Sequence, residues 1–167
     1  MVNIPANLKE KIQGHSDIGG NVIREFNQFM IERNENFEFK FIKVDKLNQR
    51  EKQNYNLIDK ILGLIGSKTS NVPDILISET MQKDDYSFRA AEGLYKGGQI
   101  IIKRSALSDT KRFISVLLHE IAHVESGATD ATRAFEDELT NMLGITGLKA
   151  IDLSKETKKG FLPSIFG

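Results

Sequence analysis

The sequence contains no cysteine among its 167 residues. Because thiolates are absent, neither a disulfide framework nor a cysteine-based metal site can form, and any metal ion must be held by imidazole and carboxylate groups. Imidazoles are scarce as well, since the three histidines are His15, His119 and His123. Any metal site that uses imidazole ligands is therefore confined to these three positions.

The chain also lacks an excess of charge and a long apolar run. Lys plus Arg (23) equals Asp plus Glu (23), so no net field draws the whole molecule to nucleic acid or to an anionic membrane. No apolar run approaches the ~20 residues of a membrane span, and the first residues, MVNIPANLKEK, have no apolar core of signal-peptide length. We therefore expect a cytoplasmic protein that binds neither nucleic acid nor membrane.

Length and composition predict one folded domain with short extensions. Residues 1–36 are predicted to form a helical N-terminal extension, in which Asp17 caps a helix and apolar residues recur at helical spacing. These apolar residues are Ile18, Val22, Phe26, Phe29 and Met30. Residues 37–147 are predicted to be the folded domain, and residues 148–167 a polar tail.

The first half of the domain shows a strand, helix, strand pattern. Apolar and polar residues alternate over 37–44, which predicts a strand, and a 3.6-residue rhythm over 48–66 predicts a crossover helix. Residues 74–78 are predicted to form a second strand, parallel to the first. Gly97 and Gly98 then separate two apolar runs, which predicts a hairpin and an antiparallel strand. The fold class is α+β, with a small mixed sheet.

The segment KRFISVLLHEIAHVES predicts a helix that begins after Ser108 or Asp109 and is stopped by Gly127. Its apolar side chains surround most of the circumference, so the helix should be buried nearly all round. These are Phe113, Ile114, Val116, Leu117, Leu118, Ile121, Ala122 and Val124. Polar side chains buried there cost several kcal/mol each unless a partner of comparable strength satisfies them.

His119, Glu120 and His123 form the pattern H-E-x-x-H on this helix. Residues four apart lie one above the other, so both imidazoles can bind one ion, while Glu120 can reach a water molecule on its open side. The alternative is a pair of hydrogen-bonded core histidines beside an incidental glutamate, which leaves both rings and the carboxylate to other groups. The pattern predicts a zinc site.

A third ligand must follow Gly127, because catalytic zinc takes three protein ligands and a water. The candidates are Asp130 and Glu136, on a second helix predicted to start near residue 129 and to end at Gly144. In a tight antiparallel pair of helices, the residues opposite the histidines are 134–136, which favours Glu136. Asp130 remains the alternative, either as ligand or as a carboxylate that orients a ligand imidazole.

With these residues and this order of elements, the chain resembles a zincin metallopeptidase over residues 37–146. A ligand glutamate on the following helix is similar to the gluzincin clan, and to the small minigluzincins in particular, although Thr140 stands where many gluzincins place an aspartate. The string HEIAHVESGATDATRAFEDELTNMLG also resembles the zincin-like domain attached to Hsp90-type ATPases in bacterial proteins. That likeness would make an ATPase-type domain a partner.

The resemblance implies a peptidase that hydrolyses peptide bonds in a peptide or protein substrate with Zn²⁺. His119, His123 and Glu136 would hold the metal, and Glu120 would act as general base toward the bound water. The alternative is a catalytically silent zincin-fold module that binds a peptide or a partner, with a cleft that one of the two terminal segments covers.

The resemblance also implies where the substrate lies. In zincins it extends along the antiparallel edge strand, which here maps to residues 90–94, where Ala91 and Gly93 leave room for an added backbone. A second donor to the transition state is usual in such enzymes, and the candidates are His15, Tyr86, Tyr95 and Arg133.

Overall fold

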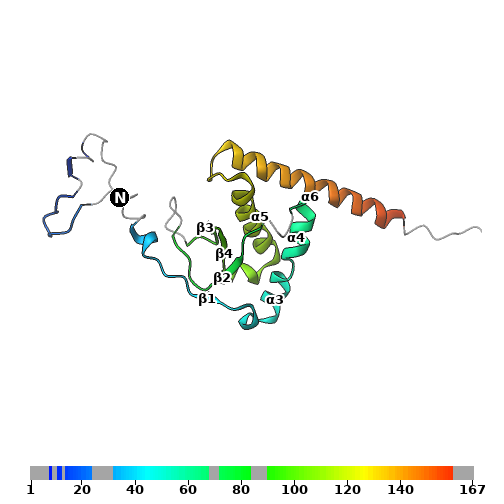
Figure 1. Ribbon diagram of the computed structural model, residues 1–167, viewed down its shortest axis with the longest axis horizontal. Coiled ribbons are helices and arrows are strands. Elements are labelled where there is room, and N and C mark those ends of the chain that lie inside the picture. Colours follow the sequence, from blue (N-terminus) through cyan, green and yellow to red (C-terminus); the bar gives the residue numbers. More distant parts are fainter. Residues whose placement is uncertain are drawn as a thin grey trace, which may run out of the picture. The chain divides into compact units, whose positions relative to one another are not determined.

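The computed structural model describes residues 8, 11–12, 14–23, 32–67, 72–83 and 90–153, and the backbone of the last helix continues to Lys159. The chain forms two compact units. The first comprises Met1–Phe39 and Gln82–Ala91, and the second comprises Lys40–Met81 and Glu92–Gly167. The second unit holds the sheet and the long helices, which are labelled in Figure 1.

Residues 14–23 of the first unit form a turn, so the helix predicted to start at Asp17 is wrong there. Ser16 and Val22 pair in an antiparallel bridge, and the Asp17 carboxylate accepts a hydrogen bond of 2.8 Å from the backbone N–H of Asn21. The physical reason is Gly20, whose φ of 79° is incompatible with a right-handed helix. The other predicted apolar positions, residues 26, 29 and 30, lie outside the described residues.

The second unit contains a mixed four-stranded sheet, which confirms the α+β fold class. The strands are β1 (Phe41–Ile42), β2 (Ile75–Ser78), β3 (Gly93–Lys96) and β4 (Gln99–Lys103). Their order is β1-β2-β4-β3, so β3 lies at one edge (Figure 1). β2 and β4 are parallel, whereas β3 runs antiparallel to β4.

β1 pairs with β2 in the antiparallel direction, which corrects the predicted parallel pairing. A single crossover helix would return the chain parallel to its first strand. Here the connection contains two short helices, α3 (Gln49–Tyr55) and α4 (Ile58–Ile65), and they follow a 3-10 turn, η1 (Val44–Lys46). Two helices in series allow the chain to reverse a second time, so the return strand is antiparallel.

The hairpin predicted at the glycine pair is confirmed. Gly97 and Gly98 have φ values of 60° and 75°, which is the geometry that a two-residue turn between twisted strands requires. Lys96 pairs with Gln99 across it, and Gly93 pairs with Ile102 at the far end of β3. The hydrogen bond from Lys103 N–H to Glu92 C=O, 2.8 Å, continues the ladder beyond the strand.

The two long helices are α5 (Thr110–Ser126), which follows a 3-10 segment, η3 (Arg104–Ser108), and α6 (Arg133–Lys159). α5 begins and ends as predicted: the Asp109 side chain accepts from the backbone N–H of Arg112, and Gly127 closes the helix in the left-handed conformation. α6 does not end at Gly144, because a glycine inside a helix costs only about 1 kcal/mol and good helix formers follow it.

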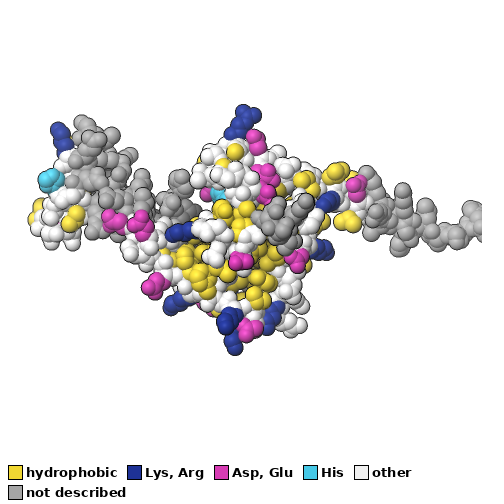
Figure 2. Space-filling view, in the orientation of Figure 1, with side chains coloured by type: hydrophobic (Ala, Val, Ile, Leu, Met, Phe, Trp, Pro, Cys, Tyr) yellow, Lys and Arg dark blue, Asp and Glu magenta, His cyan; other side chains and the backbone are white. Residues whose placement is uncertain are grey.

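α6 therefore passes through the predicted boundary at residue 147. Its second half carries exposed apolar residues at several positions round the helix, among them Leu143, Leu148, Ile151 and Leu153, and apolar side chains reach the surface along it in Figure 2. Within the described part of the chain, no helix is both long and apolar enough to cross a membrane.

The core lies between the sheet and the helices. From α5 it takes Phe113, Leu117, Ile121 and Ala122, and from β4 it takes Ile100 and Ile102. Ile114, Val116, Leu118 and Val124 are only partly buried, so α5 is buried on one side rather than nearly all round. The polar side of α5 is thereby left partly open to solvent.

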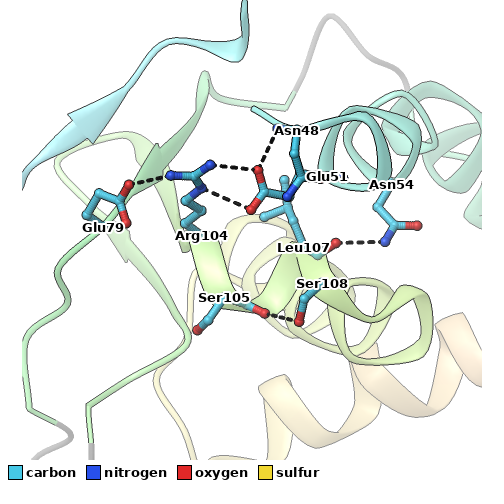
Figure 3. Close-up of polar contacts among 8 residues, drawn as sticks. All are labelled: Asn48, Glu51, Asn54, Glu79, Arg104, Ser105, Leu107 and Ser108. Carbon is cyan, nitrogen blue, oxygen red and sulfur yellow. Dashed lines mark hydrogen bonds and ion pairs between the residues drawn. The ribbon is translucent and has the colours of Figure 1, made fainter. Parts of the chain in front are cut away.

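A polar network fixes α3 to the segment before α5 (Figure 3). Arg104 donates two hydrogen bonds to the Glu51 carboxylate, of 2.9 and 3.0 Å, and a third of 2.6 Å to Glu79. Glu51 also accepts from the backbone N–H of Asn48 and so completes a capping box. The hydrogen bonds from Arg104 keep the pKa of Glu51 below its usual value.

Removal of this carboxylate should weaken the fold. We expect Glu51→Ala to lower the free energy of unfolding by about 2 kcal/mol, because a charge-assisted pair and a helix cap are lost together. Gln53→Ala, at an exposed position of the same helix, should change it by less than about 0.5 kcal/mol. Urea unfolding followed by circular dichroism measures both, and equal effects of the two variants would contradict the role of the network.

Candidate metal centre

α5 brings its two histidines together on the partly open side of the helix. One turn separates them, and their Nε2 atoms lie 3.3 Å apart. His119 keeps 41% of its side chain exposed and His123 keeps 15%. The placement follows from the helix register, because residues four apart share a face.

The loop between α5 and α6 adds a carboxylate to this pair. Asp130 Oδ1 lies 3.2 Å from His119 Nε2 and 3.4 Å from His123 Nε2. The chain turns back over the histidines because Gly127 and Ala131 both have positive φ, of 61° and 58°. A left-handed conformation is uncommon for alanine, so the loop holds Asp130 at some local cost.

The spacing of these three atoms fits a tetrahedral zinc ion. For metal–ligand distances of about 2.0–2.1 Å and tetrahedral angles, ligand atoms lie about 3.3–3.4 Å apart. The three distances here are 3.2, 3.3 and 3.4 Å, a nearly equilateral triangle. Among the described residues, His119, His123 and Asp130 form the group of side chains able to hold a metal ion.

The hydrogen bonds of His123 also fit a ligand. Its Nδ1 lies 2.8 Å from the carbonyl oxygen of Ala128, which can only accept, so Nδ1 carries a proton. In the neutral ring Nε2 then offers a lone pair, directed at the other two ligand atoms. Such a second hydrogen bond to a carbonyl is typical of metal-bound histidines. Burial lowers the pKa of His119, although the charge of Asp130 opposes the shift, and this favours the neutral form.

Phe135, in the first turns of α6, supports both rings. It stacks on His123 at 4.4 Å between ring centroids and meets His119 edge-on at 4.9 Å. Phe135 is buried together with Met142, on the side of α6 that faces the core. Its contact with both imidazoles depends on the angle between α5 and α6, which no local pattern encodes.

Glu120 lies on the buried side of the pair, with 4% of its surface exposed. Burial, with a smaller contribution from the charge of Asp130, raises the pKa of Glu120 to about 8, and a hydrogen bond from the backbone of Tyr95 opposes the shift. The carboxylate packs against Gly93 of β3. The Glu120 side chain therefore fills the space between β3 and its own helix, α5.

Glu136, which the helix-pair geometry favoured as third ligand, is exposed and is not part of the group of three. That geometry assumed a turn at residues 127–128, whereas the loop extends to Thr132 and α6 begins at Arg133. The longer loop carries Asp130 over the histidines and leaves Glu136 on the outer side of the first helical turn.

The remaining predicted residues lie in several places. Arg133 is exposed beside Asp137, Tyr95 lies on β3 with 38% of its surface exposed, and Tyr86 is outside the described residues. Ala91 and His15 belong to the first unit. There the backbone N–H of Ala91 donates to the carbonyl oxygen of Gln82.

Comparison with known proteins gives one distant relative of undescribed function. The chain is 24% identical over 144 residues to an uncharacterized protein of Mycoplasma pneumoniae, and the match covers 84% of this chain and 76% of the relative. No family model matches the chain, and no solved structure matches it.

The pKa of Glu120 generates a prediction about stability. Between its ordinary value of 4.5 and about 8, the folded metal-free chain holds a proton that the unfolded chain has lost. The stability that this group contributes is therefore complete below pH 4.5 and falls as the pH rises toward 8. We expect wild type to lose stability relative to Glu120→Gln across this window, by an amount on the order of a few kcal/mol.

Urea unfolding at several pH values, with a chelator present, measures this difference. The comparison between the two proteins cancels the opposite contribution of His119, whose lowered pKa makes stability rise with pH. Parallel pH profiles for wild type and Glu120→Gln would contradict the burial of an ionisable carboxyl at this position.

Proposed function

We propose that the chain is a zinc-dependent peptidase of the zincin type, in which His119, His123 and Asp130 hold the metal and Glu120 is the general base. The observation that carries the proposal is the triangle of ligand atoms, with sides of 3.2–3.4 Å, beside a buried glutamate. A zinc ion held there would lower the pKa of a bound water and polarise a substrate carbonyl.

The exposure of the ligands supports a catalytic rather than a closed structural site. Half of the Asp130 side chain and two fifths of the His119 side chain are accessible. Three protein ligands leave a fourth position for water or substrate in a tetrahedral site. Within the described residues the group has three such members, and two of them are accessible to solvent, so water could reach an ion held there.

Glu120 supplies the proton transfers in this proposal. Its carboxylate receives a proton from the attacking water and donates it to the nitrogen of the leaving amine. The raised pKa in the metal-free chain is lowered again by a nearby dication, since an opposite charge favours the ionised form. The Tyr95 backbone hydrogen bond keeps the carboxylate oriented while its charge changes.

β3 provides the surface along which a peptide would extend. Across a two-residue hairpin, hydrogen-bonded and non-bonded pairs alternate, and the pair Glu92–Lys103 is hydrogen-bonded. Gly93 and Tyr95 are therefore non-bonded positions, whose main-chain groups face away from β4. The N–H of Tyr95 is engaged by the Glu120 carboxylate, so an extended peptide would pair with the remaining main-chain groups of this edge, which adjoins the helix of the histidines. A cytoplasmic location and an ATPase-type partner domain belong to the same proposal.

Substitution of the general base tests the proposal. Glu120→Gln should bind as much zinc as wild type but cleave a denatured protein substrate at least about 100-fold more slowly, because the proton acceptor is lost. Glu125→Gln, on the exposed side of the same helix, should leave cleavage unchanged. Zinc content is measured by elemental analysis.

Two outcomes would count against this account. If Glu120→Gln cleaves the substrate as fast as wild type, Glu120 is not the base. A zinc-loaded wild type that cleaves no substrate would favour the alternative, a catalytically silent module that binds a peptide or a partner protein.

A further inference from the structure

Gly93 is the point where the edge strand comes closest to the helix of the site. A Cβ atom built on Gly93 would overlap Glu120 Oε1 and would lie 2.8 Å from Glu120 Cδ and 2.7 Å from Val116 Cγ1. Real side chains do not approach this closely. A residue with any side chain at position 93 would therefore displace its neighbours on α5 or push β3 away from the helix.

The backbone itself does not require glycine at this position. Gly93 is in the extended conformation of a strand and is not among the glycines with positive φ. Gly63, in α4, is a useful contrast, because a Cβ there would meet no atom within 4 Å. The demand for glycine at position 93 thus comes from the side chains of α5, and two of the three closest atoms belong to Glu120.

β3 is fastened to α5 on both sides of Gly93. Before it, Glu92 forms an ion pair with Arg112, whose Nε lies 2.6 Å from the carboxylate. After it, the backbone of Tyr95 hydrogen-bonds to Glu120. Because the Glu92–Arg112 pair opposes a shift of the strand, a side chain at position 93 would relieve the overlap by moving the side chains of α5, chiefly the Glu120 carboxylate.

We propose that Gly93 is a positioning residue for Glu120: the missing side chain leaves the space in which the carboxylate lies, between the edge strand and α5. This assignment rests on the proposed function only for its effect on catalysis. β3 would then have two separate roles. The side of Gly93 that faces α5 contacts Glu120, and the outer main-chain edge of the strand remains for a peptide.

A stability comparison tests the contact without any assay of activity. In the metal-free chain, Gly93→Ala should lower the thermal midpoint by several degrees, and the loss should be clearly smaller in a Glu120→Ala background. Gly63→Ala should not lower the midpoint. An equal loss of thermal midpoint in both backgrounds would overturn the assignment. So would a Val116→Ala background that reduces the loss as much as Glu120→Ala does, because Gly93 would then be a general packing residue.

The zinc-loaded chain tests the consequence for catalysis. Gly93→Ala should bind zinc with wild-type affinity, because it contacts none of the three ligands, while kcat falls on the order of 10- to 100-fold through misplacement of the base. KM should change less than kcat. Retention of the wild-type kcat would overturn the assignment. If wild type itself cleaves nothing, the proposed function fails, and the stability comparison still decides whether Gly93 positions Glu120.

Discussion

The proposed site depends on one constraint: two imidazoles, one helical turn apart, lie within 3.4 Å of a carboxylate oxygen from the following loop. Three electron-rich atoms at 3.2–3.4 Å from one another repel unless protons or a cation separate them. The proton of His123 is already committed to the carbonyl oxygen of Ala128. In the proposed site, a divalent cation would satisfy all three atoms together.

Three different parts of the chain hold this arrangement in place. Phe135 packs against both rings, the loop before α6 adopts a left-handed backbone at Ala131, and the edge strand covers Glu120. These supports come from three elements other than α5: the helix α6, the loop before it and the strand β3. This arrangement therefore forms only when α5, α6 and β3 are packed together, so a metal bound there would be coupled to the fold of the second unit.

Much of the fold and half of the site could be predicted from the sequence, because those features are encoded locally. Asp109 and Gly127 bound α5 by capping chemistry, Gly97 and Gly98 specify the hairpin, and helical spacing aligns the histidines. The carboxylate that lies against the histidines could not be predicted in this way. Whether Asp130 or Glu136 reaches the histidines depends on where a loop ends and α6 begins, and the spacing of residues does not fix that point. The antiparallel β1 and the role of Gly93 are likewise set by packing between distant segments.

The most direct test of the central claim is the zinc affinity of three full-length proteins: wild type, Asp130→Asn and Glu136→Gln. Titration of the metal-free proteins, followed by calorimetry and by the thermal midpoint, reports both stoichiometry and coupling to the fold. The account predicts one zinc per chain, unchanged affinity in Glu136→Gln, and a loss of at least about 10-fold in Asp130→Asn. A wild-type thermal midpoint that does not change with zinc would contradict this prediction, and so would a loss of zinc affinity confined to Glu136→Gln.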